Sequence, residues 1–268
     1  MIKIAVNGVC GRMGRMILGL AFQDEEIEVA AGLEHPGHGD LGVDLGTLAG
    51  GGETGVKVTQ SIKENIDVLI DFTTPDATMN ALWTCPESNT ALVIGTTGHS
   101  REQHAAIEDA AKMIPIVLAP NMSVGVNVMF ELTRRAAELL DNRYDVEIVE
   151  AHHRFKKDAP SGTAKRLVEI VVEGRGAKKP AVVCGREGMV GGRKPGEIGV
   201  HAVRAGDIVG DHTVTFTTLG ERLEITHRAH SREGFARGAL LAAKFIAGKP
   251  PGLYTMHDVL GITASTPK

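Results

Sequence analysis

The chain has 268 residues, of which 43% are hydrophobic and 4% aromatic, and its formal net charge at pH 7 is -4. This length suits one large domain or two ordinary ones, and the hydrophobic fraction is typical of a folded chain rather than a disordered one. Because the charge is modest and the sequence suggests neither a signal peptide nor a membrane span, we expect a soluble, cytoplasmic enzyme that binds no nucleic acid and no membrane.

Short apolar runs alternate with amphipathic segments in the first half of the chain. Strands are predicted at residues 2–7, 27–33, 67–72, 91–95 and 114–120, and helices at 11–23, 75–83 and 101–113. Strands separated by helices pair in parallel, and apolar runs without a two-residue alternation indicate burial on both faces. Segment 37–55 is rich in glycine and shows no convincing element, so we interpret it as a mobile loop, either a functional lid or a plain connector.

The pattern changes after about Ser123. Helices are predicted at 126–140, 164–172 and 234–246, and strands at 144–151, 181–184, 199–205, 213–218 and 222–230. The last two strands form a hairpin, and strands that follow one another without helices indicate a mixed or antiparallel sheet. Because an open sheet of this kind often pairs with other subunits, we expect an oligomer.

These patterns together predict an α/β chain with a Rossmann-like parallel-sheet domain and a second, α+β domain with a mixed open sheet. The last helix can pack back onto the first domain, which makes that domain discontinuous. We place a dinucleotide-binding domain at 1–123 and 233–268, and a substrate-binding and oligomerisation domain at 124–232.

The turn from Gly8 to Gly14 follows the first strand and opens a helix, in the pattern GxxGxxG. Glycines let the backbone approach a pyrophosphate, and a helix N-terminus offers N–H groups and a positive dipole end. In this context the turn predicts a dinucleotide-binding site. An ordinary tight turn between a strand and a helix is the alternative.

Glu34 ends the second strand about 20 residues past the turn, where an acidic residue meets the ribose hydroxyls of the adenosine. A carboxylate there repels a 2′-phosphate, and His35 stands where a binder of that phosphate often has Arg. We therefore expect NADH to be preferred, or to be used alongside NADPH if Arg12 offsets the repulsion; a solvated strand-end carboxylate is the alternative for Glu34. Two further turns, 95–98 and 119–122, follow strands and are placed to border the nicotinamide half of the cofactor.

The most informative segment is 150–164, where a predicted strand ends in two histidines, basic residues follow, and a Pro-Ser-Gly-Thr turn opens a helix. Histidine exchanges protons near neutral pH, and lysine binds a carboxylate or donates a proton. The turn offers N–H groups and hydroxyls to an anion at a helix N-terminus. The combination favours a small substrate with carboxylates that needs a proton, although each residue alone also fits a structural or solvated role. The residues concerned are His152, His153, Lys156, Ser161, Gly162 and Thr163.

No metal site is expected from the sequence. The three cysteines are far apart and form no CxxC pair, so we interpret Cys10, Cys85 and Cys184 as free thiols in a reducing compartment. The later histidines match no zinc-binding spacing, and we interpret them as solvated strand residues. They are His201, His212, His227 and His230.

Segment 150–164 strongly resembles the signature of the 4-hydroxy-tetrahydrodipicolinate reductase family, long called dihydrodipicolinate reductases, of lysine and diaminopimelate biosynthesis. The resemblance covers nearly the whole chain and extends to segments 8–14, 71–73, 95–98, 121–127, 204–210 and 220–227. It implies an oxidoreductase that reduces the hydroxylated dicarboxylate, by way of dihydrodipicolinate, to tetrahydrodipicolinate with NADH or NADPH. It also implies a homotetramer built through the sheet of the second domain.

The resemblance implies roles for individual residues. His152 matches the family's proton donor or acceptor, and Lys156 matches its second proton donor. The substrate contacts expected beside them are His153, Ser161, Gly162 and Thr163. The matched cofactor contacts are Gly8, Val9, Cys10, Gly11, Arg12, Met13, Glu34, Gly95, Thr96, Thr97, Ala119, Pro120, Asn121 and Met122.

Two features depart from the family pattern. Cys10 replaces a residue that is often Gly, and it brings a side chain near the pyrophosphate turn. Thr74 and His35 stand where some members carry Arg, and the missing Arg weakens the case for tight NADPH binding. Two other functions stay open. An amino-acid or aldehyde dehydrogenase on the same architecture would be favoured by a catalytic thiol, and a nucleotide-sensing module would not need segment 150–164.

Overall fold

The computed structural model describes residues 1–176 and 181–262, and the chain divides into two compact units. The first unit comprises residues 1–124 and the segment that begins at Arg232, and the second comprises residues 125–231. The end of the expected 233–268 segment, residues 263–268, lies outside the described residues. Within the described ranges, no helix is both long and apolar enough to cross a membrane.

The first unit is built on a seven-stranded parallel sheet, in the order β12-β6-β5-β4-β1-β2-β3. Its central strands β4 and β5 are buried along their whole length, as the unbroken apolar runs predict. The strands are β1 (Ile2–Asn7), β2 (Ile27–Leu33), β3 (Val58–Thr59), β4 (Val68–Asp71), β5 (Ala91–Ile94), β6 (Pro115–Leu118) and β12 (Gly252–Tyr254). The sequence did not predict β3 and β12, because two or three residues are too few to form a recognisable apolar pattern.

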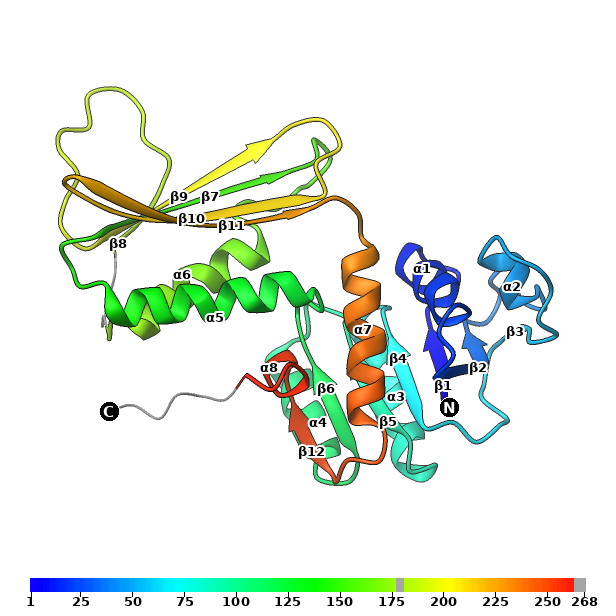
Figure 1. Cartoon of the computed structure of the whole chain (residues 1–268). Coiled ribbons are helices and arrows are strands. Elements are labelled where there is room, and N and C mark those ends of the chain that lie inside the picture. The colour runs from blue at the N-terminus through cyan, green and yellow to red at the C-terminus, as the bar shows by residue number, and fades with distance from the viewer. Residues whose placement is uncertain (177–180, 263–268) are drawn as a thin grey trace. The chain divides into compact units, whose positions relative to one another are not determined.

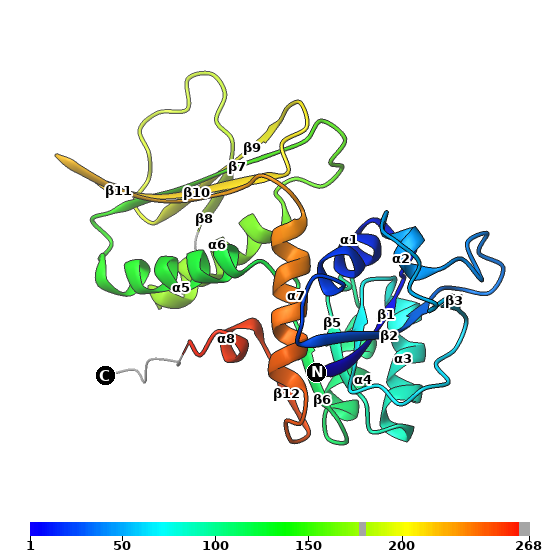
Figure 2. The ribbon, with the colours of Figure 1, turned by 45° about the vertical axis from the view of Figure 1, so that its right-hand side comes forward.

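Helices cover both faces of this sheet (Figures 1 and 2). One core lies under α1 and α7, where Ile17 and Ala243 pack with Val6 of β1. The other lies under α3 and α4, where Leu82 and Ile107 pack with strand residues of the opposite face. The helices are α1 (Arg12–Ala21), α3 (Pro75–Glu87), α4 (Arg101–Ala110), α7 (Glu233–Ile246) and α8 (Met256–Val259). The sequence predicted all of these except the single-turn α8.

The glycine-rich segment 37–55 is more structured than the sequence predicted. It contains a short helix, α2 (Leu45–Leu48), whose first residue is fully buried in the core. The carboxylate of Asp44 caps this helix and also accepts hydrogen bonds from the backbone N–H groups of Thr54 and Gly55, at 3.0 and 2.7 Å. The expectation of a loop without an element was wrong, because one capping carboxylate and one buried leucine order a turn too short to show periodicity.

The second unit has a mixed five-stranded sheet in the order β11-β10-β7-β9-β8, which confirms the predicted fold class. Strand β10 is antiparallel to β11 and β7, whereas β9 is parallel to β7 and β8. Two helices cover one face of the sheet (Figure 1). The elements are α5 (Val124–Leu139), β7 (Asp145–His152), α6 (Gly162–Gly174), β8 (Ala181–Cys184), β9 (Glu197–Arg204), β10 (Gly210–Thr218) and β11 (Glu221–Ala229).

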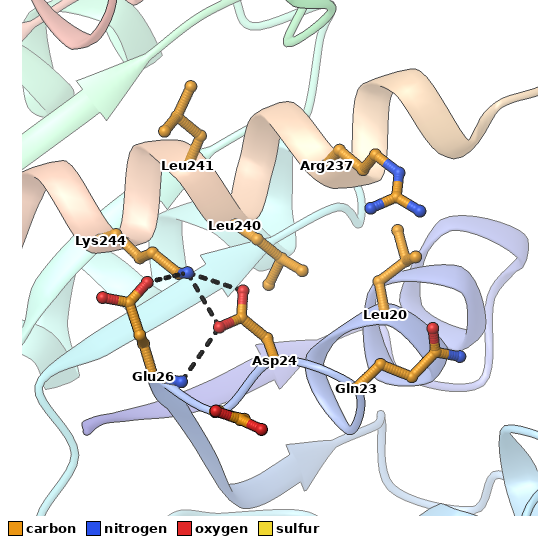
Figure 3. Close-up of a pocket in the computed structure, with 9 residues that line it drawn as sticks. Leu20, Gln23, Asp24, Glu26, Arg237, Leu240, Leu241 and Lys244 are labelled. Carbon is orange, nitrogen blue, oxygen red and sulfur yellow. Dashed lines mark hydrogen bonds and ion pairs between the residues drawn. The ribbon is translucent and has the colours of Figure 1, made fainter.

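Lys244 ties the late helix α7 to the beginning of the chain. Its ammonium donates hydrogen bonds to Asp24 and Glu26, which lie between α1 and β2 (Figure 3). Leu20 and Leu240 line the same cavity, whose volume is about 540 Å³. The contact between Lys244 and Asp24 joins segments 220 residues apart in the chain. Because both side chains are only partly exposed, solvent screens the attraction between their charges incompletely.

We expect Lys244→Met to lower the free energy of unfolding by about 1 kcal/mol, measured by urea denaturation at pH 7. The hydrogen bond from Lys244 lowers the pKa of Asp24 below its usual 3.8, so the stabilisation is present above that pH and is lost as the pH falls below it. The difference in the free energy of unfolding between the wild type and Lys244→Met should therefore shrink in strong acid.

The matched control is Arg237→Met on the same helix. Arg237 pairs with Glu233 one turn away, so its loss should cost less than about 0.5 kcal/mol. Equal losses for the two variants would show that Lys244 does not act as a link between distant segments.

Candidate functional site

The turn after β1 brings the start of α1 against the end of the strand. Gly8 has a φ of +73°, and a Cβ there would lie 2.7 Å from Cγ2 of Thr73 and 2.8 Å from the carbonyl oxygen of Phe72. A Cβ on Gly14 would lie 2.3 Å from the carbonyl oxygen of Gly8. Glycine is therefore required at both ends of the turn, which holds the helix N-terminus in the approach that a pyrophosphate needs.

Cys10 is accommodated within this turn, because the left-handed residue is Gly8. Its backbone N–H donates to the carboxylate of Glu34 at 3.2 Å, and its carbonyl accepts from Arg15 at 2.9 Å. Burial, followed by the negative charges of Glu34 and Asp40, raises the pKa of the thiol to about 11. The thiol is therefore protonated at neutral pH and is not an activated nucleophile.

A cavity of about 840 Å³ opens beside the turn. Among the expected cofactor residues, Gly8, Gly11 and Glu34 line it. Other lining residues were not among the expected site residues, and they include His35, Pro36, Ser61, Thr73, Thr74 and Ala77. Thr73 and Thr74 follow β4 at the carboxyl edge of the sheet, so the rule that ligands bind beyond these strand ends could have identified them.

Asp71, at the end of β4, is fully buried and holds several strand ends together. Its carboxylate accepts hydrogen bonds from the side chains of Asn7, Thr73, Thr78 and Thr96 at 2.5–2.9 Å. The hydroxyl of Thr96 also accepts from the backbone N–H of Thr73 at 2.8 Å. The side chain of Thr96 is thus used within the protein, and only its backbone remains to face a cofactor.

The remaining expected cofactor residues divide by burial. Val9, Ala119 and Met122 have side chains in the core, so a cofactor could meet only their backbone. Gly95 packs against the ring of Phe72, with no room for a Cβ. The exposed ones are Arg12, Thr97 and Pro120, and the half-buried ones are Met13 and Asn121.

In the second unit, the fully buried carboxylate of Glu150 joins the expected catalytic residues. One oxygen lies 2.6 Å from Nδ1 of His152, and the other accepts the backbone N–H of Ser161 at 3.0 Å. The guanidinium of Arg204 donates to both oxygens, at 2.7 and 2.8 Å. His152 at the end of β7 and the start of α6 therefore meet at one carboxylate.

The surroundings of His152 have opposing effects on the pKa of its imidazole. Burial lowers the pKa of its imidazole, and Lys156 and Arg204 add to that effect, whereas Glu150 partly restores the protonated form. Burial would raise the pKa of Glu150, but the hydrogen bonds from Arg204, His152 and Ser161 bring it below its usual value. The site thus holds a neutral imidazole beside an ionised carboxylate near pH 7.

The turn before α6 is open on its outer side. Ser161 caps the helix by accepting the backbone N–H of Ala164 at 3.2 Å, and a Cβ on Gly162 would meet no atom within 4 Å. Lys156 lies in the loop before this turn and pairs with the exposed carboxylate of Asp158 at 2.8 Å. The partly buried ring of His153 has an Nδ1 atom that is buried without a hydrogen-bond partner among the described residues.

His212 corrects the expectation of solvated strand histidines. It is 4% exposed, its Nε2 lies 3.2 Å from the hydroxyl of Ser161, and its ring meets that of His152 edge to face at 5.2 Å between centroids. Burial lowers its pKa to about 4. The alternation of Val214 and Phe216 already placed position 212 on the inward face of β10, and this signal could have identified it.

The other three histidines are less buried. His201 pairs with Glu147 at 2.8 Å, His227 is half-buried, and His230 is exposed. A different group, Cys10, His38 and Asp40, has ligand atoms within 4.8 Å of one another. Asp40 is already paired with Arg15 at 2.8 Å, and the raised pKa of the thiol disfavours the thiolate that a metal ion requires.

Comparisons with known proteins cover almost all of the chain. Residues 2–122 match the family model described as dihydrodipicolinate reductase, N-terminus, and residues 125–260 match dihydrodipicolinate reductase, C-terminus. Proteins named 4-hydroxy-tetrahydrodipicolinate reductase are similar to this chain. The one from Syntrophotalea carbinolica is 51% identical (98% of this chain, 100% of the relative), and the one from Rubrobacter xylanophilus is 51% identical (97% and 98%).

Solved structures give the same picture. A dipicolinate-bound dihydrodipicolinate reductase from Paenisporosarcina sp. TG-14 matches with a TM-score of 0.79 at 27% identity, covering 98% of this chain and 100% of that one. An amine dehydrogenase from Mycobacterium smegmatis matches with a TM-score of 0.60 at 15% identity, covering 95% of each chain, which shows a common fold alone.

The buried His212 predicts a specific loss of stability in mild acid. Its pKa is about 4 in the folded chain and 6.5 when unperturbed, so the unfolded state binds more protons as the pH falls between these values. Between pH 7 and pH 4.5, the wild type should lose about 2 kcal/mol of unfolding free energy relative to His212→Gln. Urea denaturation of both proteins across this range measures the difference, and parallel curves would contradict a neutral buried His212.

Proposed function

The chain belongs to the dihydrodipicolinate reductase family and is an oxidoreductase, and we propose that it reduces 4-hydroxy-tetrahydrodipicolinate, by way of dihydrodipicolinate, to tetrahydrodipicolinate in lysine and diaminopimelate biosynthesis. The observation that carries the proposal is the buried carboxylate of Glu150, which joins the ring of His152 to the turn that opens α6. Neither an aldehyde dehydrogenase nor a nucleotide sensor requires this arrangement. The thiol of Cys10, in the glycine turn, is protonated near pH 7 and therefore supplies no nucleophile there.

The first unit would bind the cofactor. The residues at the glycine turn fit a dinucleotide. A Cβ at Gly8 would clash with Thr73, and one at Gly14 would clash with the turn backbone, so glycine at both positions lets the N-terminus of α1 pack closely on the end of β1. Gly8 and Gly11 would cradle the pyrophosphate, and Glu34, which lines the same cavity, would accept hydrogen bonds from the ribose hydroxyls. When bound, the nicotinamide supplies the hydride.

The second unit would bind the dicarboxylate. Gly162 and Thr163 would hold one carboxylate at the N-terminus of α6, where the helix dipole favours an anion, and Ser161 would support the turn that presents them. His153 would contact the substrate beside them. The dipicolinate bound to the Paenisporosarcina reductase is a flat dicarboxylate of the same class.

His152 and Lys156 would manage the proton. Reduction adds one hydride and one proton to the conjugated system, and the hydroxylated substrate also loses water. A neutral imidazole with a lowered pKa can accept a proton and return it near pH 7. Lys156, whose ammonium pairs with Asp158 at 2.8 Å, would donate a proton or neutralise substrate charge.

The proposal extends to assembly and location. The sheet of the second unit is covered by helices on one face, while Val149 and Val203 are 40% and 44% exposed in the single chain. A homotetramer formed through this sheet would cover them. The three cysteines are free, which fits a cytoplasmic, reducing compartment.

The direct test is NADH oxidation, followed by absorbance, with freshly generated 4-hydroxy-tetrahydrodipicolinate. Turnover is expected with this substrate, and its absence with both NADH and NADPH would overturn the proposed function.

In the same assay, His152→Ala should lower kcat by about 100-fold or more with a much smaller rise in KM, because the proton transfer is lost and substrate binding is not. His230→Ala, which removes an exposed histidine, is the control and should retain wild-type kcat.

The carboxylate of Glu34 predicts the cofactor preference. We expect kcat/KM with NADH to equal or exceed that with NADPH, because this carboxylate repels a 2′-phosphate. Glu34→Ala should shift the NADH to NADPH ratio of kcat/KM toward NADPH by about tenfold, equivalent to about 1.4 kcal/mol. A strong wild-type preference for NADPH would refute the role given to Glu34.

A further inference from the structure

Two polar residues continue the inward-facing row of β7. Val146 and Ile148 are fully buried in the core, and the next two residues with the same orientation are Glu150 and His152. Buried polar groups are costly unless they are hydrogen-bonded, so this pair calls for a physical reason.

The hydrogen bonds of Glu150 determine which nitrogen of His152 carries the proton. Arg204 and the backbone N–H of Ser161 already donate three hydrogen bonds to the carboxylate, which is therefore ionised and can only accept. The 2.6 Å contact with Nδ1 of His152 then requires that Nδ1 be the donor. The imidazole is thus held as the Nδ1–H tautomer, with its lone pair on Nε2.

The other ring nitrogen is left available. Within residues 1–176 and 181–262, no hydrogen-bonding partner contacts Nε2 of His152. A Cβ on Gly210 would approach this atom to 3.1 Å, so the glycine keeps the space beside it clear. The rings of His212 and His152 meet edge to face. His212 stays neutral above about pH 4, because burial lowers its pKa to about 4.

We propose that Glu150, clamped by Arg204, is the positioning residue of this site: it fixes the ring and tautomer of His152 so that Nε2 is the atom that exchanges the proton. This inference rests on the proposed role of His152 in reduction. The carboxylate also favours the imidazolium that forms when Nε2 accepts a proton, whereas Arg204 and Lys156 oppose it. The arrangement parallels the carboxylate that orients the histidine of serine hydrolases.

The first test leaves Glu150 and Arg204 unchanged. Nitrogen-15 NMR of histidine-labelled wild-type protein distinguishes the two neutral tautomers of each imidazole, and the His152→Ala spectrum identifies the His152 signals. We expect the Nδ1–H tautomer for His152 at neutral pH. The Nε2–H tautomer, or a mixture of the two, would overturn the proposal whether or not the protein reduces the proposed substrate.

The second test compares two glutamates on one strand. In Glu150→Gln, the amide N–H₂ can face Nδ1 and hold the other tautomer, so we expect kcat to fall by about tenfold or more, with KM within about threefold. Its NMR spectrum should show Nε2–H, and its kcat–pH profile should shift to lower pH, because the favourable charge beside His152 is gone. The control residue, Glu147, lies on the other face of β7, where its carboxylate contacts Arg186, Arg193 and His201. Glu147→Gln removes the charge of that carboxylate and should keep kcat within about twofold of the wild-type value.

These measurements separate the explanations. Equal losses of kcat in the two variants, with an unchanged His152 tautomer in Glu150→Gln, would mean that Glu150 only stabilises the fold. Should Glu150→Gln fail to fold, Arg204→Lys keeps the positive charge but loses the bidentate contact, and it should broaden or shift the His152 signals. Absence of turnover in the wild type, together with the expected tautomer, would refute the proposed function and leave the geometry of the pair intact.

Discussion

A buried carboxylate must be surrounded by hydrogen-bond donors, and this constraint organises both units. In the first unit, Asp71 accepts hydrogen bonds from side chains at or just after the ends of three neighbouring strands, and so fixes the loops at the carboxyl edge of the sheet. In the second, Glu150 gathers a strand, a helix N-terminus and an arginine from β9. Each carboxylate lies beside a proposed binding site and leaves the ligand-facing groups with few alternative positions. Rigid support of this kind is what precise positioning of reactants requires.

The need to satisfy these buried carboxylates also shows which of the expected site residues hold the site in place rather than face a ligand. Thr96 stands in a polar turn at a strand end and was expected to meet the cofactor, but its hydroxyl is bound to Asp71. Ser161 was expected to meet the substrate, yet its N–H is bound to Glu150 and its hydroxyl caps α6 and contacts His212. Short polar motifs therefore combine residues that hold the site with residues that face it, and the sequence does not distinguish them, because both kinds must be polar.

Cys10 shows how a departure from a motif is absorbed. The left-handed backbone lies at Gly8 and the close helix contact at Gly14, so the position between them tolerates a side chain. Burial, together with the neighbouring carboxylates of Glu34 and Asp40, raises the pKa of its thiol and keeps it protonated. A turn that the sequence marks as imperfect retains its geometry because the two positions with absolute steric demands are still glycine.

The sequence by itself determined the fold class, the order of the long elements and the segments that carry the chemistry. Periodicity and strand–helix alternation are local properties, and the motifs at 8–14 and 150–164 are contiguous. Only the tertiary structure decided the roles of Glu150, Arg204 and His212, because β7, β9 and β10 come together through pairings that link residues as far apart in the chain as Asp145 and Thr217. It also decided which parts of segment 37–55 are ordered, since the buried Leu45 and the capping Asp44 act through packing and hydrogen bonds that leave no periodic trace. Burial and hydrogen-bond partnership are properties of the folded chain, and they set the protonation states on which the proposed chemistry depends.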